Sequence, residues 1–265
     1  MIDKSKTPEE NKAKIVKNWL PRYTGMELDK FGKYILLVNF KHYIQSFAEH
    51  YGVKIYGEDK AMQAATYNNI TIINFGMGSA NAATVMDLLT AISPKACLFL
   101  GKCGSLKNKI PVGALLLPIG AIRGEGTSDD YMHPLVPSIP ALALERAVSH
   151  VVKAYHQDYF SGVIYTTNRR MWEHDKVFKD KLTSMKATGV DMETATIFTV
   201  GFKNDIPTGG LLLVSDKPMT PKGIKTEASD KIVTQNYSLL QLKIGMDTLK
   251  QIINSGESVK HLKDW

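Results

Sequence analysis

The sequence predicts an α/β fold, in which strands of a buried sheet alternate with helices. Continuous apolar runs, typical of strands buried on both faces, are found at residues 34–38, 70–75, 96–100, 114–122, 162–167 and 211–214. Segments with helical spacing lie between or after these runs, at residues 41–51, 80–91, 141–155 and 228–254. No proline- or serine-rich linker divides the 265 residues, so we expect one main domain.

The expected organisation has three parts: a helical arm over residues 1–30, the main domain over residues 31–255 and a polar tail over residues 256–265. In the arm, residues 8–20 have an amphipathic pattern that places Ile15, Val16, Trp19 and Leu20 on one face, and we expect this helix to stop at Pro21 with a loop over residues 22–25. Such an arm is consistent either with packing on a neighbouring subunit or with a mobile terminus.

Composition excludes several classes of protein. The net charge is +7, but the lysines are spread along the chain, which hints at a small acidic substrate and not at nucleic acid. Residues 1–6 lack the apolar core of a signal peptide, and no apolar stretch is long enough to span a bilayer, so we expect a cytoplasmic protein without a membrane partner. Cys97 and Cys103 are expected to be reduced thiols. The seven histidines show no metal-ligand spacing, so no metal is expected.

Residues 188–216 form the most informative stretch. A short strand breaks at Asp191, a helix-period segment with Ala195, Phe198 and Phe202 on one side follows, and an apolar run then ends in Ser215-Asp216. Glu193 and Asp216 therefore both lie at the carboxyl ends of strands, where ligands bind in open α/β sheets.

The acids also have ordinary explanations. Asp191 is best explained as the residue that caps the following helix, and Glu193 lies where the helix dipole favours a carboxylate. Asp216 could form a turn before Lys217. The presence of two such acids in one strand–helix–strand unit favours a functional site.

Two glycine turns follow predicted strands. Residues 76–79, with Gly78, expose backbone N–H groups that suit an anion, but Asn81 replaces the third glycine of a dinucleotide-binding motif. Residues 101–104 place Lys102 in a strand-end turn, where it either faces a phosphate or is a solvated lysine.

Other cations and hydroxyls lie in loops. Arg123, Thr127 and Ser128 suit a phosphate, although a structural turn network explains them equally well. A second group follows the strand at residues 162–167 and suits an anionic ligand with a flat base, or a subunit interface. This second group consists of Asn168, Arg169, Arg170 and Trp172. Residues 217–227 contain three lysines, Lys225 among them, and could close over a site as a lid.

In this order, the turns at 76–79 and 101–104, the segment Val190-Asp191-Met192-Glu193 and Ser215-Asp216 resemble the purine nucleoside phosphorylase and nucleosidase family. The resemblance extends from about residue 34 to the final helix. It implies a three-layer αβα sandwich with a mixed, partly barrel-like central sheet, a homo-oligomer, specifically a hexamer, and no cofactor. Residues 18–25, 98–104, 122–128 and 165–170 resemble the short bacterial AMP nucleosidases of that family, which implies hydrolysis of AMP to adenine and ribose 5-phosphate.

The resemblance also implies roles for individual residues. Asp216 would protonate the purine at N7, Glu193 would accept hydrogen bonds from the ribose hydroxyls, and Met192 would pack against the sugar. The other expected substrate contacts are Gly78, Lys102, Arg123, Thr127, Ser128, Asn168, Arg169, Arg170, Trp172, Ser215 and Lys225.

Two departures from the family pattern bear on the reaction. Phe99 stands where phosphorylases of the family hold inorganic phosphate with an arginine, and Lys102 replaces a small hydroxyl residue, so hydrolysis is favoured. The glutamate that activates water in methylthioadenosine nucleosidases is absent after the first strand, where Asn39-Phe40-Lys41-His42 stands, so the group that acts on water stays open. A phosphorylase, a methylthioadenosine-type nucleosidase and a non-catalytic nucleotide sensor are the alternatives.

Overall fold

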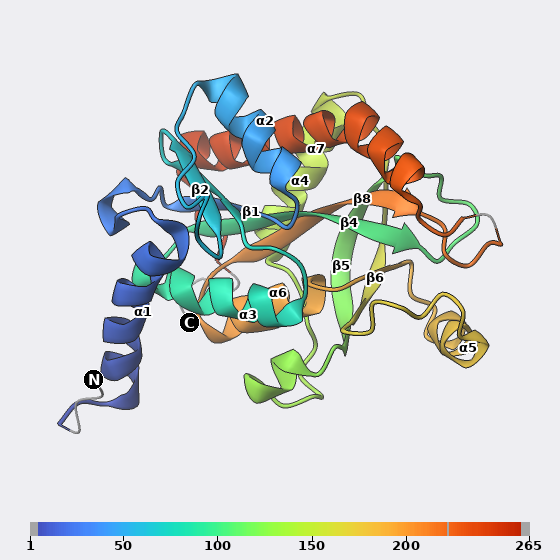
Figure 1. The fold of residues 1–265 in the computed structure, drawn as a ribbon, viewed down its shortest axis with the longest axis horizontal. Helices are drawn as coiled ribbons and strands as arrows, with labels where there is room; N and C mark the ends of the chain where they lie inside the picture. Colours follow the sequence, from blue (N-terminus) through green and yellow to red (C-terminus); the bar gives the residue numbers. More distant parts are fainter. Residues whose placement is uncertain (1–4, 222, 261–265) are drawn as a thin grey trace.

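In the computed structural model, which describes residues 5–221 and 223–260, a mixed sheet lies between two layers of helices (Figure 1). This arrangement confirms the predicted three-layer αβα sandwich. The strands are β1 (Tyr34–Val38), β2 (Gln63–Tyr67), β3 (Ile70–Asn74), β4 (Ala96–Ser105), β5 (Leu115–Gly124), β6 (Tyr159–Thr167), β7 (Gly189–Asp191) and β8 (Thr208–Asp216).

Five of the strands close into a barrel. Around the ring the order is β4, β7, β6, β5 and β8, and the ring closes because β8 also pairs in parallel with β4. The pairs β4–β7 and β5–β8 are antiparallel, whereas β5–β6 and β6–β7 are parallel. From β4 the sheet continues as an open extension through β1 and β3 to β2. The partly barrel-like sheet is thus confirmed.

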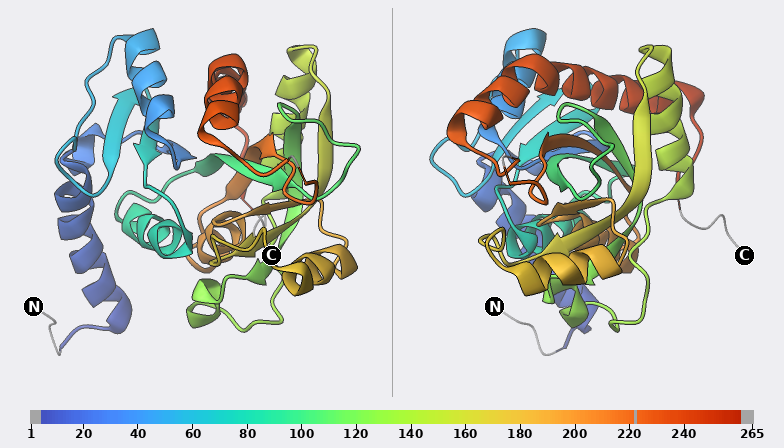
Figure 2. Two further views of the ribbon diagram at one scale, coloured as in Figure 1. Left: turned by 45° about the vertical axis from the view of Figure 1, so that its right-hand side comes forward. Right: turned by 90° about the vertical axis from the view of Figure 1, so that its right-hand side faces the viewer.

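The helices are divided between the two faces of the sheet (Figures 1 and 2). One face is covered by α2 (Lys41–Tyr51), α4 (Leu142–Ala154) and α7 (Glu227–Ser255). The other is covered by α1 (Pro8–Thr24), α3 (Ser79–Leu88) and α6 (Thr194–Lys203). The short helix α5 (Lys176–Ser184) packs against β6 and β7 through a small separate cluster. Single 3₁₀ turns are η1 (Leu28–Lys30), η2 (Leu89–Ala91) and η3 (Thr127–Asp130).

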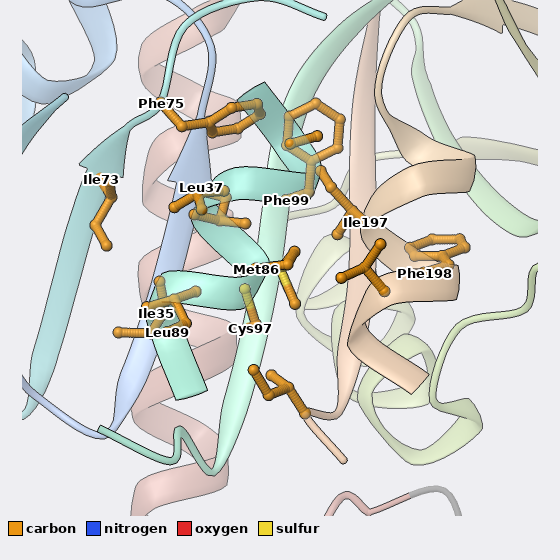
Figure 3. Close-up of a cluster of buried hydrophobic side chains, with 14 of the residues drawn as sticks. Ile35, Leu37, Ile73, Phe75, Met86, Leu89, Cys97, Phe99, Ile197 and Phe198 are labelled. Atoms are coloured by element: carbon orange, nitrogen blue, oxygen red, sulfur yellow. The ribbon is translucent and has the colours of Figure 1, made fainter. Parts of the chain in front are cut away.

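Two hydrophobic cores explain why the strands are continuously apolar. In β1, Ile35 and Leu37 point into the core shared with α3 and α6, while Leu36 and Val38 point into the core under α2 and α7. Successive strand residues face opposite sides, so a sheet covered on both faces has no exposed position to fill with a polar residue. Figure 3 shows the first of these cores, where Phe99 lies near Phe75.

The helical arm differs from its predicted form. Helix α1 continues through Pro21 to Thr24 and ends at Gly25, whose left-handed conformation (φ 66°) lets its N–H bond to the Pro21 carbonyl over 2.7 Å. Proline lacks only its own N–H, so one lost bond close to the end of the helix is tolerated. Of the predicted apolar face, Val16 and Leu20 are buried, whereas Ile15 and Trp19 are exposed.

Other sequence predictions also need correction. The edge strand β2 and helix α5 were not predicted, because neither carries a continuous apolar run. Phe202 is exposed at the end of α6, although its spacing placed it on the buried side with Phe198. Residues 256–265 were expected to form a polar tail, but Val259 is buried in the second core. Residues 1–4 of the arm, Lys222 of the expected lid and residues 261–265 of the tail lie outside the described residues.

Candidate active site

A cavity of about 300 Å³ opens at the carboxyl ends of the barrel strands and of β1. Its lining comes from the segment after β1, from β4, β6, β7 and β8, and from the loop before α7 and the first turn of that helix. The chain therefore places its cavity where α/β folds usually bind ligands. The lining residues used below are Asn39, Phe40, Lys102, Cys103, Arg169, Arg170, Trp172, Glu173, Asp191, Met192, Glu193, Ser215, Asp216, Lys225 and Asp230.

Glu193 lies at the start of α6 and is almost fully buried. Its Oε1 accepts a hydrogen bond from the Gly78 N–H over 2.7 Å, and the nearby Asn39 side chain favours the ionised form of the carboxyl group, which acts to lower its pKa. Burial, together with the nearby Asp191, raises the pKa of Glu193 to about 8. The glycine turn expected to bind an external anion thus holds a carboxylate of the chain itself.

Asp191 is held by hydrogen bonds from the neighbouring strand β6 and from the start of α6. One carboxylate oxygen accepts from the Thr166 hydroxyl over 2.7 Å, and the other accepts from the Thr194 N–H over 2.8 Å. Burial raises its pKa, and these bonds oppose the rise. The contacts agree with a helix-start role for Asp191, although one edge of the residue also lines the cavity.

Asp216 ends β8 and faces the same cavity. The Ser215 hydroxyl donates to its Oδ1 over 2.6 Å. Burial raises the pKa of Asp216, and the Ser215 bond and Lys225 act in the opposite direction. A carboxyl group in this setting can carry a proton nearer to neutral pH than an exposed one, as a general acid must.

The segment after β6 forms one wall of the cavity. Trp172 is buried and its ring packs 5.6 Å from that of Phe178. Arg169 pairs with Asp175 over 2.6 Å, and Arg170 is 3.2 Å from Glu173. Both arginines line the cavity, but each already has an acidic partner on its own loop.

The opposite wall carries a cluster of two lysines and one aspartate. The side chain of Lys102 is buried, and its Nζ donates to Asp230 over 2.9 Å and to Thr234 over 2.7 Å. It also lies 4.8 Å from the centre of the Phe40 ring. Lys225 Nζ is 3.4 Å from the same Asp230 oxygen. Burial lowers the pKa of Lys102, and Asp230 opposes this shift.

Five of the predicted contacts lie outside the cavity wall: Gly78, Arg123, Thr127, Ser128 and Asn168. All five N–H donors of Arg123 are used by Ser128, Asp129 and three backbone carbonyls, with distances of 2.6–3.1 Å. Asn168 donates to the carbonyl of Glu125 and to Thr127. The contacts of Arg123, Thr127, Ser128 and Asn168 therefore match the structural turn network that the sequence left as an alternative. The physical reason is that a buried guanidinium is satisfied by the nearest carbonyls before any ligand arrives.

The structure also brings in residues that were not predicted. Asp230, in the first turn of α7, forms ion pairs with both lysines, but nothing in its sequence neighbourhood indicated a site. Asn39 follows β1 directly and lines the cavity, so its position at a strand end was a usable signal.

Cys97 and Cys103 are both free and buried. Residues 5–221 and 223–260 contain no cluster of three or more His, Cys, Asp or Glu side chains that could hold a metal ion. Over the same residues, the helices are too short or too polar to cross a bilayer.

Comparison with known proteins agrees with this geometry. The sequence model of the Phosphorylase superfamily matches residues 33–244. The crystal structure of AMP nucleosidase from Bacteroides thetaiotaomicron superposes with a TM-score of 0.84 at 52% identity, covering 92% of this chain and 99% of that one. Uridine phosphorylase from Vibrio fischeri, at 20% identity and a TM-score of 0.74 over 84% of this chain and 94% of its own, shares the fold.

Among curated proteins, AMP nucleosidase of Escherichia coli K12 is 27% identical over 247 residues, which cover 76% of this chain. The match covers 51% of that relative, so this chain spans about half of its length. Uridine phosphorylase of Treponema pallidum is 22% identical over 72% of this chain and 80% of its own length. With the family match extending across the barrel and the cavity, the chain belongs to the Phosphorylase superfamily.

Proposed function

We propose that this chain hydrolyses the N-glycosidic bond of AMP and releases adenine and ribose 5-phosphate. The observation that carries the proposal is that one cavity holds Glu193, Asp216 and the two lysines Lys102 and Lys225. The similarity to proteins named AMP nucleosidase in B. thetaiotaomicron and E. coli supports the same substrate.

The two acids suit the two halves of the reaction. Breaking the bond between C1′ and N9 leaves a positive ribose and a negative purine, so the site must stabilise both charges. Asp216 donates its proton to N7, which lets the purine take the electron pair of the broken bond. Glu193 accepts hydrogen bonds from the ribose hydroxyls. Because its pKa in the free chain is about 8, Glu193 must lose its proton before its negative charge can favour the cationic sugar. Met192 lies beside it in the cavity wall.

The lysine cluster suits the phosphate of the substrate. Lys102 and Lys225 bring two positive charges to one wall, and Asp230 neutralises only one of them. Phe99, in contrast, is fully buried against Phe75 in the core. An apolar ring at that position supports water as the acceptor, because it offers no ligand to inorganic phosphate.

The wall formed by Trp172, Arg169 and Arg170 suits the base. A purine is flat and apolar on its faces, and Trp172 presents a rigid aromatic surface to the cavity. Ser215 orients the acid that the purine meets, since its hydroxyl bonds to Asp216.

The test is incubation of the purified protein with AMP in phosphate-free buffer, with chromatographic detection of the products. Adenine and ribose 5-phosphate should appear in equal amounts, and adding inorganic phosphate should not be required. Cleavage of adenosine that depends on added phosphate, with ribose 1-phosphate as product, would identify a phosphorylase instead. Binding of AMP without any product would identify a nucleotide sensor.

We also propose a homo-oligomer, expected to be a hexamer. Some large apolar side chains are highly exposed on the single chain, and association with further copies would remove them from water. Examples among the described residues are Leu135, Leu142, Met171 and Val177, each at least 71% exposed. Light scattering coupled to size-exclusion chromatography measures the mass directly, and a monomer at micromolar concentration would contradict this proposal.

A further inference from the structure

Glu173 is an acid of the cavity wall to which the proposed hydrolysis gives no role. It lies in the segment between β6 and α5, directly after Trp172, and it lines the same cavity as Asp216. Its side chain is only 14% exposed. Glutamate is rarely withdrawn from water unless its carboxylate meets donors, so the partners of this group indicate its use.

The Glu173 carboxylate is held in place by its own segment. Its Oε1 lies 3.2 Å from Nη1 of Arg170, and its Oε2 accepts a hydrogen bond from the backbone N–H of Trp172 over 3.0 Å. An ionised carboxylate has about four acceptor positions, so two bonds leave acceptor capacity for a ligand. Glu173 is therefore a fixed acceptor in the wall of the cavity.

Glu173 also lies within electrostatic reach of the proposed acid. The negative charge of Glu173 raises the pKa of Asp216, and the positive charge of Arg170 lowers it. Interactions between charges are largely screened beyond about 10 Å at moderate ionic strength. Together with the shared cavity, this influence indicates that Glu173 and Asp216 border the same part of the bound substrate.

The geometry of a purine identifies that part. Asp216 is the proposed proton donor to N7, and N7 lies between C8 and the edge that carries the substituent at position 6. The ribose, which Glu193 is proposed to hold, is attached beyond C8 at N9. The substituent at position 6 therefore points away from the sugar, toward the wall that carries Trp172 and Glu173.

We propose that the Glu173 carboxylate accepts a hydrogen bond from the 6-amino group of adenine and thereby selects 6-aminopurine nucleotides. The proposal rests on the proposed hydrolysis of AMP and names the residue that chooses its base. In IMP and GMP an oxygen replaces the amino group. This oxygen cannot donate, and its lone pairs would face the carboxylate, so the site rejects these nucleotides by repulsion.

The neighbouring cation would favour the opposite choice. The Arg170 guanidinium only donates, so it would bind the 6-oxygen of IMP. Its side chain is 52% exposed, however, and its Nη1 is directed at Glu173. Glu173 is the more buried member of the pair, and its carboxylate is the group that we expect the base to meet.

The experiment measures kcat/KM for AMP, for IMP and for purine riboside 5′-monophosphate, which carries only hydrogen at position 6. Wild type should prefer AMP over IMP at least about 10²-fold. In Glu173→Ala, kcat/KM for AMP should fall about 10–10²-fold, as expected for a lost hydrogen bond to a charged group. The value for purine riboside 5′-monophosphate should change less than about threefold, because that substrate never made the bond.

Glu173→Gln tests the sign of the selection. Glutamine keeps nearly the shape of glutamate but carries an NH₂ group that donates to a 6-oxygen. We expect kcat/KM for IMP to rise at least about tenfold in this variant, while that for AMP falls. Asp180→Asn is the matched control and should behave as wild type, because Asp180 is an exposed acid of α5 that pairs with Lys176. Melting temperatures show whether each variant folds.

Comparison between substrates cancels the effect of Glu173 on the acid. Without the charge of Glu173 the pKa of Asp216 falls, so turnover that needs the protonated acid is lost at a lower pH. AMP and purine riboside 5′-monophosphate both take up a proton at N7 and share this shift. A hydrogen bond to the 6-amino group changes only their ratio.

Two results would overturn the role of Glu173 and leave the hydrolysis of AMP intact. Equal losses for AMP and purine riboside 5′-monophosphate in a folded Glu173→Ala variant would show that Glu173 acts on Asp216 or on its own loop. A wild-type preference for IMP would show that Arg170 contacts the base at position 6. A wild-type chain that released no base from any of the three nucleotides would instead overturn the proposed function itself.

Discussion

The backbone N–H of Gly78 donates a hydrogen bond to Oε1 of Glu193 over 2.7 Å, although the two residues are 115 positions apart. Gly78 has φ 97° and ψ 157°, a conformation that is essentially restricted to glycine. Glycine at this position therefore allows the turn between β3 and α3 to direct the Gly78 N–H at the carboxyl group of Glu193. The backbone conformation of Gly78 in the first half of the chain thus helps to hold Glu193, a cavity residue in the second half.

Gly78→Ala tests this relationship. An added Cβ meets no atom within 4 Å, so the cost is conformational, about 1–3 kcal/mol of stability, and turnover of AMP should fall as Glu193 loses its anchor. Gly52→Ala is the matched control, because Gly52 also has positive φ (63°) and open space but lies at the end of α2. Denaturant unfolding and initial rates measure both effects. Equal activity in the two variants would contradict a role for the anchor.

Asp216→Asn should remove most of the turnover and leave AMP binding intact. The amide has nearly the shape of the carboxyl group but cannot donate a proton to N7, and loss of a general acid costs about 10²–10⁴-fold. Calorimetry provides the Kd and product release provides kcat. Asp59→Asn, at an exposed position paired only with Lys60, is the control and should be as active as wild type. An Asp216→Asn variant with wild-type turnover would exclude Asp216 as the acid.

Lys225→Met should raise KM for AMP at least tenfold more than KM for adenosine, because charge-assisted bonds to phosphate are lost only with the nucleotide. Arg123→Ala is the comparison variant, because the sequence also suggested a phosphate contact for Arg123. Its five hydrogen bonds order the loop after β5, so we expect lower stability and equal effects on both substrates. Steady-state kinetics with AMP and with adenosine measure KM for each variant. A selective effect of Arg123→Ala on AMP would restore the phosphate role that the sequence suggested for it.

Asp230→Asn should strengthen the binding of ribose 5-phosphate. In the free chain the Asp230 carboxylate lies 2.9 Å from Lys102 and 3.4 Å from Lys225, so it competes with an incoming phosphate for the same cations. Neutralising it leaves the buried lysine without its counter-ion until a phosphate arrives. Titration calorimetry should therefore show a lower Kd in the variant. A higher Kd would mean that Asp230 holds Lys102 in place and does not compete.

Glu193→Gln should be more stable than wild type at alkaline pH and similar to it near pH 4. In the folded chain the pKa of Glu193 is raised to about 8, from 4.5, by burial and Asp191. The folded state therefore keeps a proton that the unfolded state loses, and wild-type stability declines as pH rises from about 4.5 through 8. A gap of about 5 kcal/mol is expected at pH 9, since the pKa is raised by about 3.5 units and each unit is worth about 1.4 kcal/mol. Urea unfolding across this range measures it, and a gap that shrank with rising pH would contradict the shift.

The sequence by itself determined the alternation of strands and helices and the location of the two acids at strand ends. Runs such as residues 34–38 are apolar at every position because the sheet is covered on both faces, and this signal is local. Val190-Asp191-Met192-Glu193 and Ser215-Asp216 were likewise readable, since strand ends in this class of fold face the ligand.

Only the tertiary structure decided which polar groups meet. In the sequence, Lys102 and Arg123 were equivalent candidates for a phosphate ligand. In the structure, Lys102 pairs with Asp230, 128 residues away on α7, whereas the N–H groups of Arg123 donate to residues of its own loop. Asn39 lines the same cavity as Glu193 because β1 pairs with β4 in the folded sheet. Hydrophobic periodicity is set by each segment alone, whereas the partner of a buried charge or amide depends on distant segments that the folded sheet brings together.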